Sequence, residues 1–299
     1  MSRPAPLGRP AQCALLAILL AGAGCHRASA PVAALTVAPA TLQLGFPEFT
    51  EIEIRLTPES ELPVGVEPRL FLHLLEEPGV VLRTFDHHLP GGWREGREIV
   101  YRHRLYQSAL GEPLEPGTYL LSAGLYDESG RRYALRGAGE EVAKLEYAVA
   151  EVAVPAPREG MPAVRFSDLW RPPEPGVDRQ ILGRRALGGG GAGILQIGPL
   201  QGPGEILLRV GFPEAGGGRL EIADGGGVPK VRLRSTCGGH EAEISGGGME
   251  TLVPVPPTAA PVACDIEFSP NFVLRSGDSP ESRSVTVEIV AWRAGVEDE

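Results

Sequence analysis

Hydrophobic and polar residues alternate along much of the chain, a pattern typical of strands that turn one face toward a core. In residues 51–56, Ile52, Ile54 and Leu56 alternate with charged residues. Residues 284–292 show the same period of two. No segment repeats its hydrophobic residues every 3.6 positions over three helical turns. The pattern therefore predicts an all-β chain.

Turn residues divide the N-terminal half into short predicted strands. A Pro-Gly pair separates predicted strands at 69–75 and 80–85, which indicates a hairpin. A second Pro-Gly pair precedes Tyr119 and a long apolar strand, as in the tyrosine corner of Ig-like sandwiches. We predict an Ig-like β-sandwich of about seven strands over residues 34–155.

The C-terminal half is rich in glycine and follows a proline-containing linker at 156–162. Its short predicted strands are spaced by turn residues at intervals of about 8–12 residues, which is typical of a sandwich or a jelly roll. We predict a second, jelly-roll-like β-sandwich over residues 163–297. The predicted strands are 194–197, 205–211, 219–223, 231–234, 241–244, 251–255, 264–268 and 284–292.

The first 24 residues have the three parts of an export signal. Arg3 and Arg9 form a basic region, and the apolar run after it is shorter than the ~20 residues of a membrane-spanning helix. The run ends in Gly-Ala-Gly-Cys, and this ending resembles the bacterial lipobox. Gly22 departs from the motif, which usually has leucine there. The resemblance implies cleavage before Cys25, lipid on the Cys25 thiol and a tether over residues 25–33.

An ordinary secretory signal is the alternative, and cleavage near Ala28 or Ala30 would then remove Cys25. A lipidated cysteine would anchor the chain stably, because each buried acyl methylene contributes ~0.8 kcal/mol. His26 stands where an aspartate favours inner-membrane retention in many Gram-negative bacteria. We therefore expect a lipid anchor in the bacterial cell envelope, on the periplasmic side, and in the outer rather than the inner membrane.

The charge of the chain excludes one class of partner. The 28 basic and 38 acidic residues give a formal net charge of −10, and no basic stripe is present. Binding to nucleic acid needs clustered Lys and Arg to neutralise phosphates. We therefore expect no nucleic-acid partner.

Two cysteines, Cys237 and Cys264, lie beyond the export segment. An even pair in an oxidising compartment predicts a disulfide, which would close a loop of about 28 residues. Two separate buried thiols are the alternative, because sequence spacing does not fix connectivity.

Four of the six histidines lie between positions 73 and 103. His73, Asp86, His87 and His103 are candidate metal ligands, because imidazoles and carboxylates bind zinc and other divalent ions. Their spacing matches no recognised ligand motif. The alternative is a structural role: His73 falls on the same strand face as Phe71 and would hydrogen-bond to Asp86.

Trp170 is the candidate for an exposed aromatic that stacks on a ligand such as a sugar ring. The glycine run at 188–191 lacks the Gly-Lys-Ser/Thr ending of a P-loop, and no G-x-S-x-G or H-E-x-x-H motif is present. We therefore predict no catalytic residue and no cofactor. Four further aromatics are interpreted as core or edge residues rather than as stacking platforms: Trp93, Tyr101, Tyr106 and Tyr126.

Several segments carry a family resemblance. In the first half these are FLHLLEEPGVVLRTFDHH, WREGREIVY and LEPGTYLLSAGLYDESGRRY. Residues 68–135 thereby resemble a small β-sandwich domain of bacterial envelope proteins, often appended to membrane glycosyltransferases of the mannosyltransferase type. In the second half, FSDLWRPPE, IEFSPNFVL and DSPESRSVTVEI resemble a jelly-roll-like domain that also occurs with envelope glycosyltransferases. The resemblance implies accessory domains and transfers no catalytic residue.

Together these features predict a non-enzymatic cell-envelope lipoprotein that binds or scaffolds other molecules in envelope glycan assembly. Its expected partners are the membrane, through the N-terminal lipid, and a glycan or an envelope protein. The alternative is a glycan-active or metal-dependent hydrolase that uses the region of His73, Asp86, His87 and His103.

Overall fold

The computed structural model describes residues 30–174, 183–212, 219–223, 227–245, 249–275 and 282–295. The regular elements among these residues are all strands, so the predicted all-β class is confirmed. No helix in the described part of the chain is long and apolar enough to cross a membrane. The predicted export signal, Cys25 and most of the tether lie outside the described residues.

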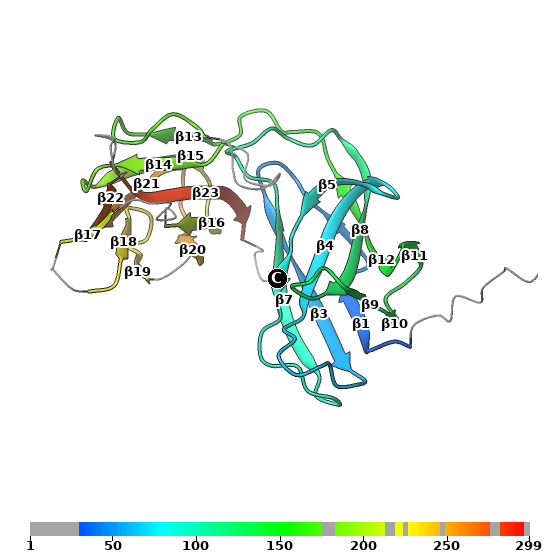
Figure 1. Cartoon of the computed structure of the whole chain (residues 1–299). Helices are drawn as coiled ribbons and strands as arrows, with labels where there is room; N and C mark the ends of the chain where they lie inside the picture. The colour runs from blue at the N-terminus through cyan, green and yellow to red at the C-terminus, as the bar shows by residue number, and fades with distance from the viewer. Residues whose placement is uncertain are drawn as a thin grey trace, which may run out of the picture. The chain divides into compact units, whose positions relative to one another are not determined.

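The first sandwich consists of two sheets (Figure 1). One sheet has the strand order β10-β1-β3-β7, and the other has the order β11-β12-β8-β4-β5 with three short strands attached. The strands of the first sheet are β1 (Ala33–Ala38), β3 (Phe49–Pro58), β7 (Ile99–Tyr106) and β10 (Leu135–Arg136). Those of the second are β4 (Arg69–Glu77), β5 (Val80–Thr84), β8 (Gly117–Tyr126), β11 (Glu141–Ala143) and β12 (Glu146–Val154), with β2 (Thr41–Gln43), β6 (His87–His88) and β9 (Arg132–Tyr133) at their sides.

The alternation in β3 sets the inner face of its sheet. Ile52, Ile54 and Leu56 are completely buried in the core between the two sheets, as the pattern predicted. The predicted hairpin forms between β4 and β5, and Gly79 at its turn has a φ of 88°, a region that glycine enters without steric cost. The Tyr119 hydroxyl donates to the Glu115 carbonyl at 2.6 Å, which makes the predicted tyrosine corner.

The second sandwich also has two sheets, with the orders β13-β15-β21-β18-β19 and β17-β22-β23-β16-β20, and β14 pairs with β23. The first contains β13 (Ala163–Phe166), β15 (Gly193–Leu200), β18 (Lys230–Ser235), β19 (Glu241–Ser245) and β21 (Val262–Pro270). The second contains β14 (Arg185–Gly188), β16 (Gly204–Gly211), β17 (Arg219–Ile222), β20 (Met249–Val255), β22 (Phe272–Arg275) and β23 (Ser282–Ala294).

Cys237 and Cys264 form the predicted disulfide, so the alternative of two separate thiols is wrong. Cys264 lies on β21, and Cys237 follows β18, its neighbour in the sheet. Both residues are buried in the core of the second sandwich, and their Cα atoms are 5.3 Å apart. The bond therefore joins two chain segments that the sheet already holds side by side.

The two sandwiches lie within one compact unit, Pro31–Glu299, and β23 contacts the first of them directly. The backbone N–H of Ala109 donates to the Val290 carbonyl at 2.7 Å, and that of Trp292 donates to the Pro47 carbonyl at 3.0 Å. The two sandwiches are therefore joined by these hydrogen bonds as well as by the linker at 156–162. Three apolar residues of the second sandwich belong to the core of the first: Leu207, Ile289 and Ala291.

Candidate functional site

A pocket of about 350 Å³ lies where the edge strands of the first sandwich face each other. β7 is the edge of one sheet, and β5 and β6 lie beside β4 at the edge of the other. His87 pairs with Leu70 across the strands, and His103 pairs with Ile52. Cross-strand neighbours share a sheet face, so both imidazoles lie on inner faces. Asp86 and Tyr101 complete this side of the pocket.

His87 is fixed by two hydrogen bonds. Its Nδ1 lies 2.9 Å from the Phe85 carbonyl oxygen, and its Nε2 lies 2.7 Å from the Tyr101 hydroxyl. Because a carbonyl only accepts, Nδ1 carries a proton and donates it to the hydrogen bond; in the neutral ring, Nε2 then accepts from the Tyr101 hydroxyl. Burial lowers the pKa of His87, although the Phe85 carbonyl and Asp86 oppose this shift. His87 and His88 are consecutive residues of the short strand β6, so their side chains point to opposite faces of the sheet.

His103 stacks on His87 with ring centroids 3.9 Å apart and an angle of 14° between the ring planes. Burial, followed by the neighbouring His87 and Arg209, lowers the pKa of His103 to about 3. The His103 ring is therefore neutral at pH 7. No residue in the described part of the chain forms a hydrogen bond with its ring nitrogens.

The second sandwich supplies the remaining charged side of the pocket. Arg209 on β16 donates to Glu250 on β20 at 2.7 Å. The second carboxylate oxygen of Glu250 lies 3.7 Å from the Arg104 guanidinium. Sequence reasoning did not find Arg209 and Glu250, because no local motif marks them and β16 and β20 follow the histidines by more than a hundred residues.

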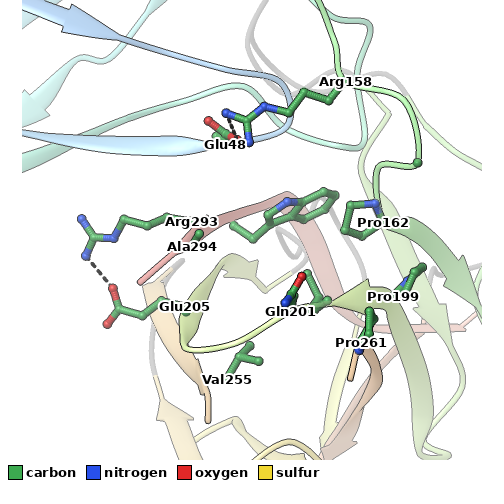
Figure 2. Close-up of a pocket in the computed structure, with 14 residues that line it drawn as sticks. Glu48, Arg158, Pro162, Pro199, Gln201, Glu205, Val255, Pro261, Arg293 and Ala294 are labelled. Atoms are coloured by element: carbon green, nitrogen blue, oxygen red, sulfur yellow. Dashed lines mark hydrogen bonds and ion pairs between the residues drawn. The ribbon is translucent and has the colours of Figure 1, made fainter. Parts of the chain in front are cut away.

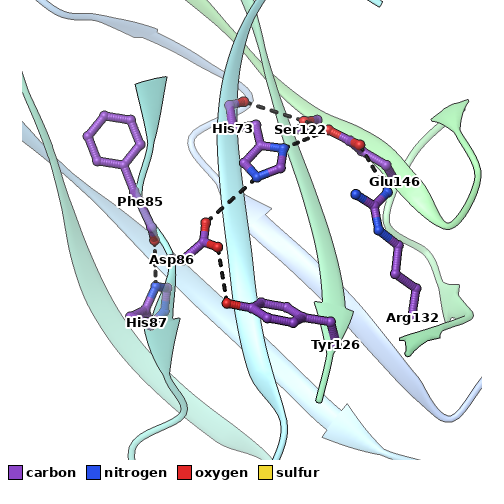
Figure 3. A network of polar contacts seen from close by, with 8 residues as sticks. All are labelled: His73, Phe85, Asp86, His87, Ser122, Tyr126, Arg132 and Glu146. Atoms are coloured by element: carbon purple, nitrogen blue, oxygen red, sulfur yellow. Dashed lines mark hydrogen bonds and ion pairs between the residues drawn. The ribbon is translucent and has the colours of Figure 1, made fainter. Parts of the chain in front are cut away.

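His73, the fourth predicted ligand, lies outside this pocket on the outer face of its sheet (Figure 3). Its ring stacks on Phe71 at 4.5 Å, in agreement with the shared face predicted for the two residues. Its Nδ1 donates to Glu146 at 3.1 Å, and its Nε2 lies 3.7 Å from Asp86. Asp86 in turn accepts a hydrogen bond from the Tyr126 hydroxyl at 3.1 Å. The structural interpretation of His73 is the one that these contacts favour.

Glu146 is the centre of this outer-face network, and its side chain is 8% exposed. One carboxylate oxygen accepts from the Ser122 hydroxyl at 2.7 Å and from His73, and the other accepts from Arg132 at 3.2 Å. Burial alone would raise the pKa of Glu146. The hydrogen bond from Ser122, the charge interaction with His73 and the hydrogen bonds from His73 and Arg132 outweigh burial and hold the pKa of Glu146 below its ordinary value.

Glu146→Gln is expected to lower the free energy of unfolding by about 1.5–3 kcal/mol, because hydrogen bonds to a charged acceptor are lost. A carboxylate with a lowered pKa contributes stability above its unfolded-state pKa and loses it as the pH falls through the folded-state pKa. Urea unfolding at pH 7 and at lower pH should therefore show a difference that narrows on acidification. The exposed Glu140→Gln is the control; an equal effect of both variants would contradict the role of the network.

The structure corrects the predicted metal site. His87 and His103 stack on each other, whereas His73 binds Glu146 on the other face of the sheet. Within the described ranges, no group of three or more His, Cys, Asp or Glu side chains is arranged to hold a metal ion. The candidates are close in sequence, but His73 points to the outer face of its sheet, whereas His87 and His103 point to inner faces.

The structure also corrects the predicted exposure of Trp170. Its side chain is buried, 6% exposed, in the core of the second sandwich. Phe166 and Phe268 pack against it edge-on, each with ring centroids 5.3 Å away. An antiparallel bridge between Trp170 and Leu187 holds this segment against the sheet. Trp170 therefore cannot serve as a stacking platform in this conformation.

A second pocket, of about 290 Å³, lies beside β23 (Figure 2). Trp292 forms part of its wall, and its two arginines already have carboxylate partners. Arg293 donates to Glu205, and Arg158 lies 3.9 Å from Glu48. The first pocket is the stronger candidate site, because His103 offers hydrogen-bonding atoms that have no partner in the described structure.

No protein-family model and no curated protein matches the chain. The Pseudomonas fluorescens alkylpurine DNA glycosylase AlkC, bound to DNA containing an abasic site analog, is 16% identical over 47% of this chain and 34% of its own, with a TM-score of 0.27. The family GH115 4-O-methyl-alpha-glucuronidase BtGH115A, with specificity for decorated arabinogalactans, is 12% identical over 52% of this chain and 20% of its own, with a TM-score of 0.28. The chain thus spans about a third and a fifth of their lengths, and these likenesses support no functional argument.

The fold and the site together define an all-β protein of two sandwiches with a small polar pocket at a sandwich edge.

Proposed function

We propose that this chain is a non-enzymatic lipoprotein of the bacterial cell envelope that binds or scaffolds other envelope molecules. The lipid on Cys25 anchors it on the periplasmic side, in the outer rather than the inner membrane. The resemblance of both sandwiches to accessory domains of envelope glycosyltransferases supports a role in envelope glycan assembly.

The observation that carries this proposal is the preformed pocket at His87 and His103. Both ring nitrogens of His87 are already bonded within the protein, so His87 supports the pocket rather than exchanging a proton with a substrate. The disulfide between Cys237 and Cys264 further supports export, because such bonds persist in oxidising compartments.

Mass spectrometry of the mature protein purified from a bacterial host is expected to find an N-terminal Cys25 with its thiol diacylglycerylated and its amine acylated. Membrane fractionation should place this form in the outer membrane. A Cys25→Ser variant, which lacks the lipid acceptor, should leave the membrane fraction. A mature N-terminus after Ala28 or Ala30 would overturn the lipid anchor and leave a secreted protein.

The competing function is a glycan-active or metal-dependent hydrolase built on the same histidines. Metal analysis of the purified protein separates the two, and we expect no stoichiometric zinc, because the imidazoles of His87 and His103 stack instead of converging. Stoichiometric zinc that disappears in His87→Ala but persists in His240→Ala would favour the hydrolase.

A further inference from the structure

We propose that the pocket between β6 and β7 binds an uncharged sugar residue through the imidazole of His103 and the hydroxyl of Tyr101. The inference deepens the proposed binding function by naming the ligand class. It does not depend on lipidation, so the two can fail separately.

The first argument is the charge of the lining. Two arginines, Arg102 and Arg209, and two carboxylates, Asp86 and Glu250, line the pocket, so their charges balance. The Arg102 guanidinium lies 3.8 Å from the Glu51 carboxylate, and Asp86 accepts a hydrogen bond from Tyr126, so neither is unpaired. Arg209 is also already bonded to Glu250. An anion such as phosphate would meet two carboxylates without an unpaired cation to bind it, and a cation would meet two guanidinium groups. A neutral ligand fits this balance.

The second argument is the hydrogen-bonding capacity that the protein leaves unused. A neutral His103 offers one N–H donor and one nitrogen acceptor, and neither has a partner in the described structure. The Tyr101 hydroxyl donates a hydrogen bond to His87, and the lone pairs of the Tyr101 oxygen remain able to accept hydrogen bonds from a ligand. Donors and acceptors thus lie side by side. Sugar hydroxyls, each of which both donates and accepts, match this arrangement.

The third argument is that these groups are held in place before any ligand arrives. His87 is locked by the Phe85 carbonyl and by Tyr101, and its ring supports the ring of His103 by stacking. A preorganised site loses less entropy on binding. The volume of about 350 Å³ is at the small end of the ~300–1,000 Å³ range of ligand pockets, which fits one or two sugar rings.

NMR titration of the full-length mature protein tests the proposal. The probes are neutral trisaccharides of glucose, mannose, galactose and N-acetylglucosamine, with inorganic phosphate and glucuronic acid as charged comparisons. At least one neutral sugar is expected to shift the imidazole signals of His103, with an affinity that changes little with salt. Phosphate and glucuronic acid should bind more weakly.

His103→Phe keeps an aromatic ring for stacking on His87 but removes both nitrogens. It is expected to weaken sugar binding about tenfold or more, the equivalent of one lost hydrogen bond. Tyr101→Phe should weaken binding as well, which provides a second variant should His103→Phe fail to fold. Tyr119→Phe removes the same hydroxyl group at the tyrosine corner and should leave affinity unchanged.

Three results would overturn the proposal. They are the absence of any shift with all four neutral sugars, tighter binding of phosphate than of every neutral sugar, and sugar binding that survives in both His103→Phe and Tyr101→Phe. If the protein is lipidated but gives one of these results, the proposed envelope location stands and the proposed sugar site is wrong. If the protein binds sugar but carries no lipid on Cys25, the proposed sugar site stands and the proposed lipid anchor is wrong.

Discussion

Trp170→Ala is expected to lower the free energy of unfolding by about 3–5 kcal/mol, the range for truncating a large buried aromatic. Trp170 is 6% exposed and contacts Phe166 and Phe268 edge-on. It also fills the space next to Gly193, where an added Cβ would come within 2.7 Å of the indole Nε1. Removal of the indole leaves a cavity that these neighbours cannot fill without moving the sheet.

Urea unfolding followed by circular dichroism measures this effect, and two further variants sharpen it. The indole N–H of Trp170 is buried without an acceptor in the described structure, so Trp170→Phe removes an unpaired donor and should cost less than Trp170→Ala. The neighbouring Leu169 is 48% exposed, and Leu169→Ala should change stability by less than about 0.5 kcal/mol. A Trp170→Ala protein of unchanged stability with weakened ligand binding would contradict the burial and restore the stacking hypothesis.

Removal of the disulfide by the double substitution Cys237→Ala and Cys264→Ala is expected to cost about 3–4 kcal/mol. The two residues are separated by 27 positions, and a cross-link over such a loop restricts the unfolded chain by that amount. The folded state should change little, because pairing of β18 with β21 already holds the two segments together. The stability loss should therefore appear with the native β-sheet spectrum retained.

The same bond gives an internal control. Reduction of the wild-type protein should lower its urea midpoint toward that of the double variant, whereas the double variant should not respond to the reductant. A wild-type midpoint that stays constant after confirmed reduction would show that the cross-link contributes nothing to stability.

Much of the fold was predictable because the alternation of hydrophobic and polar residues within a strand shows which side chains face the core. The period of two in residues 51–56 identified Ile52, Ile54 and Leu56 as core residues, and all three are fully buried. The tyrosine corner was also predictable from local sequence, because Tyr119 and the Glu115 carbonyl that its hydroxyl binds lie within five residues, on either side of the Pro-Gly turn. The disulfide was predictable from counting, because only two cysteines remain beyond the export segment.

The candidate site was predictable only in part. The cluster of histidines drew attention to Asp86, His87 and His103, which do line one pocket. Their chemistry depends on partners that the sequence does not bring close. Tyr101 fixes the proton position on His87, and Arg209 closes the pocket from another sandwich. Among the described residues the four candidate ligands do not converge on one point, because His73 lies on the outer face of its sheet whereas His87 and His103 lie on inner faces.

The sequence by itself determined the all-β class, the inner faces of the strands and the cysteine pair. These depend on neighbours along the chain or on composition, and a period of two is visible without knowing what packs where. Only the tertiary structure decided that Trp170 is buried, that His73 and His103 lie apart, and that the edges of one sandwich form a polar pocket with residues of the other. Those outcomes depend on register and on the packing of sheet edges, which join residues far apart in sequence and leave no local pattern.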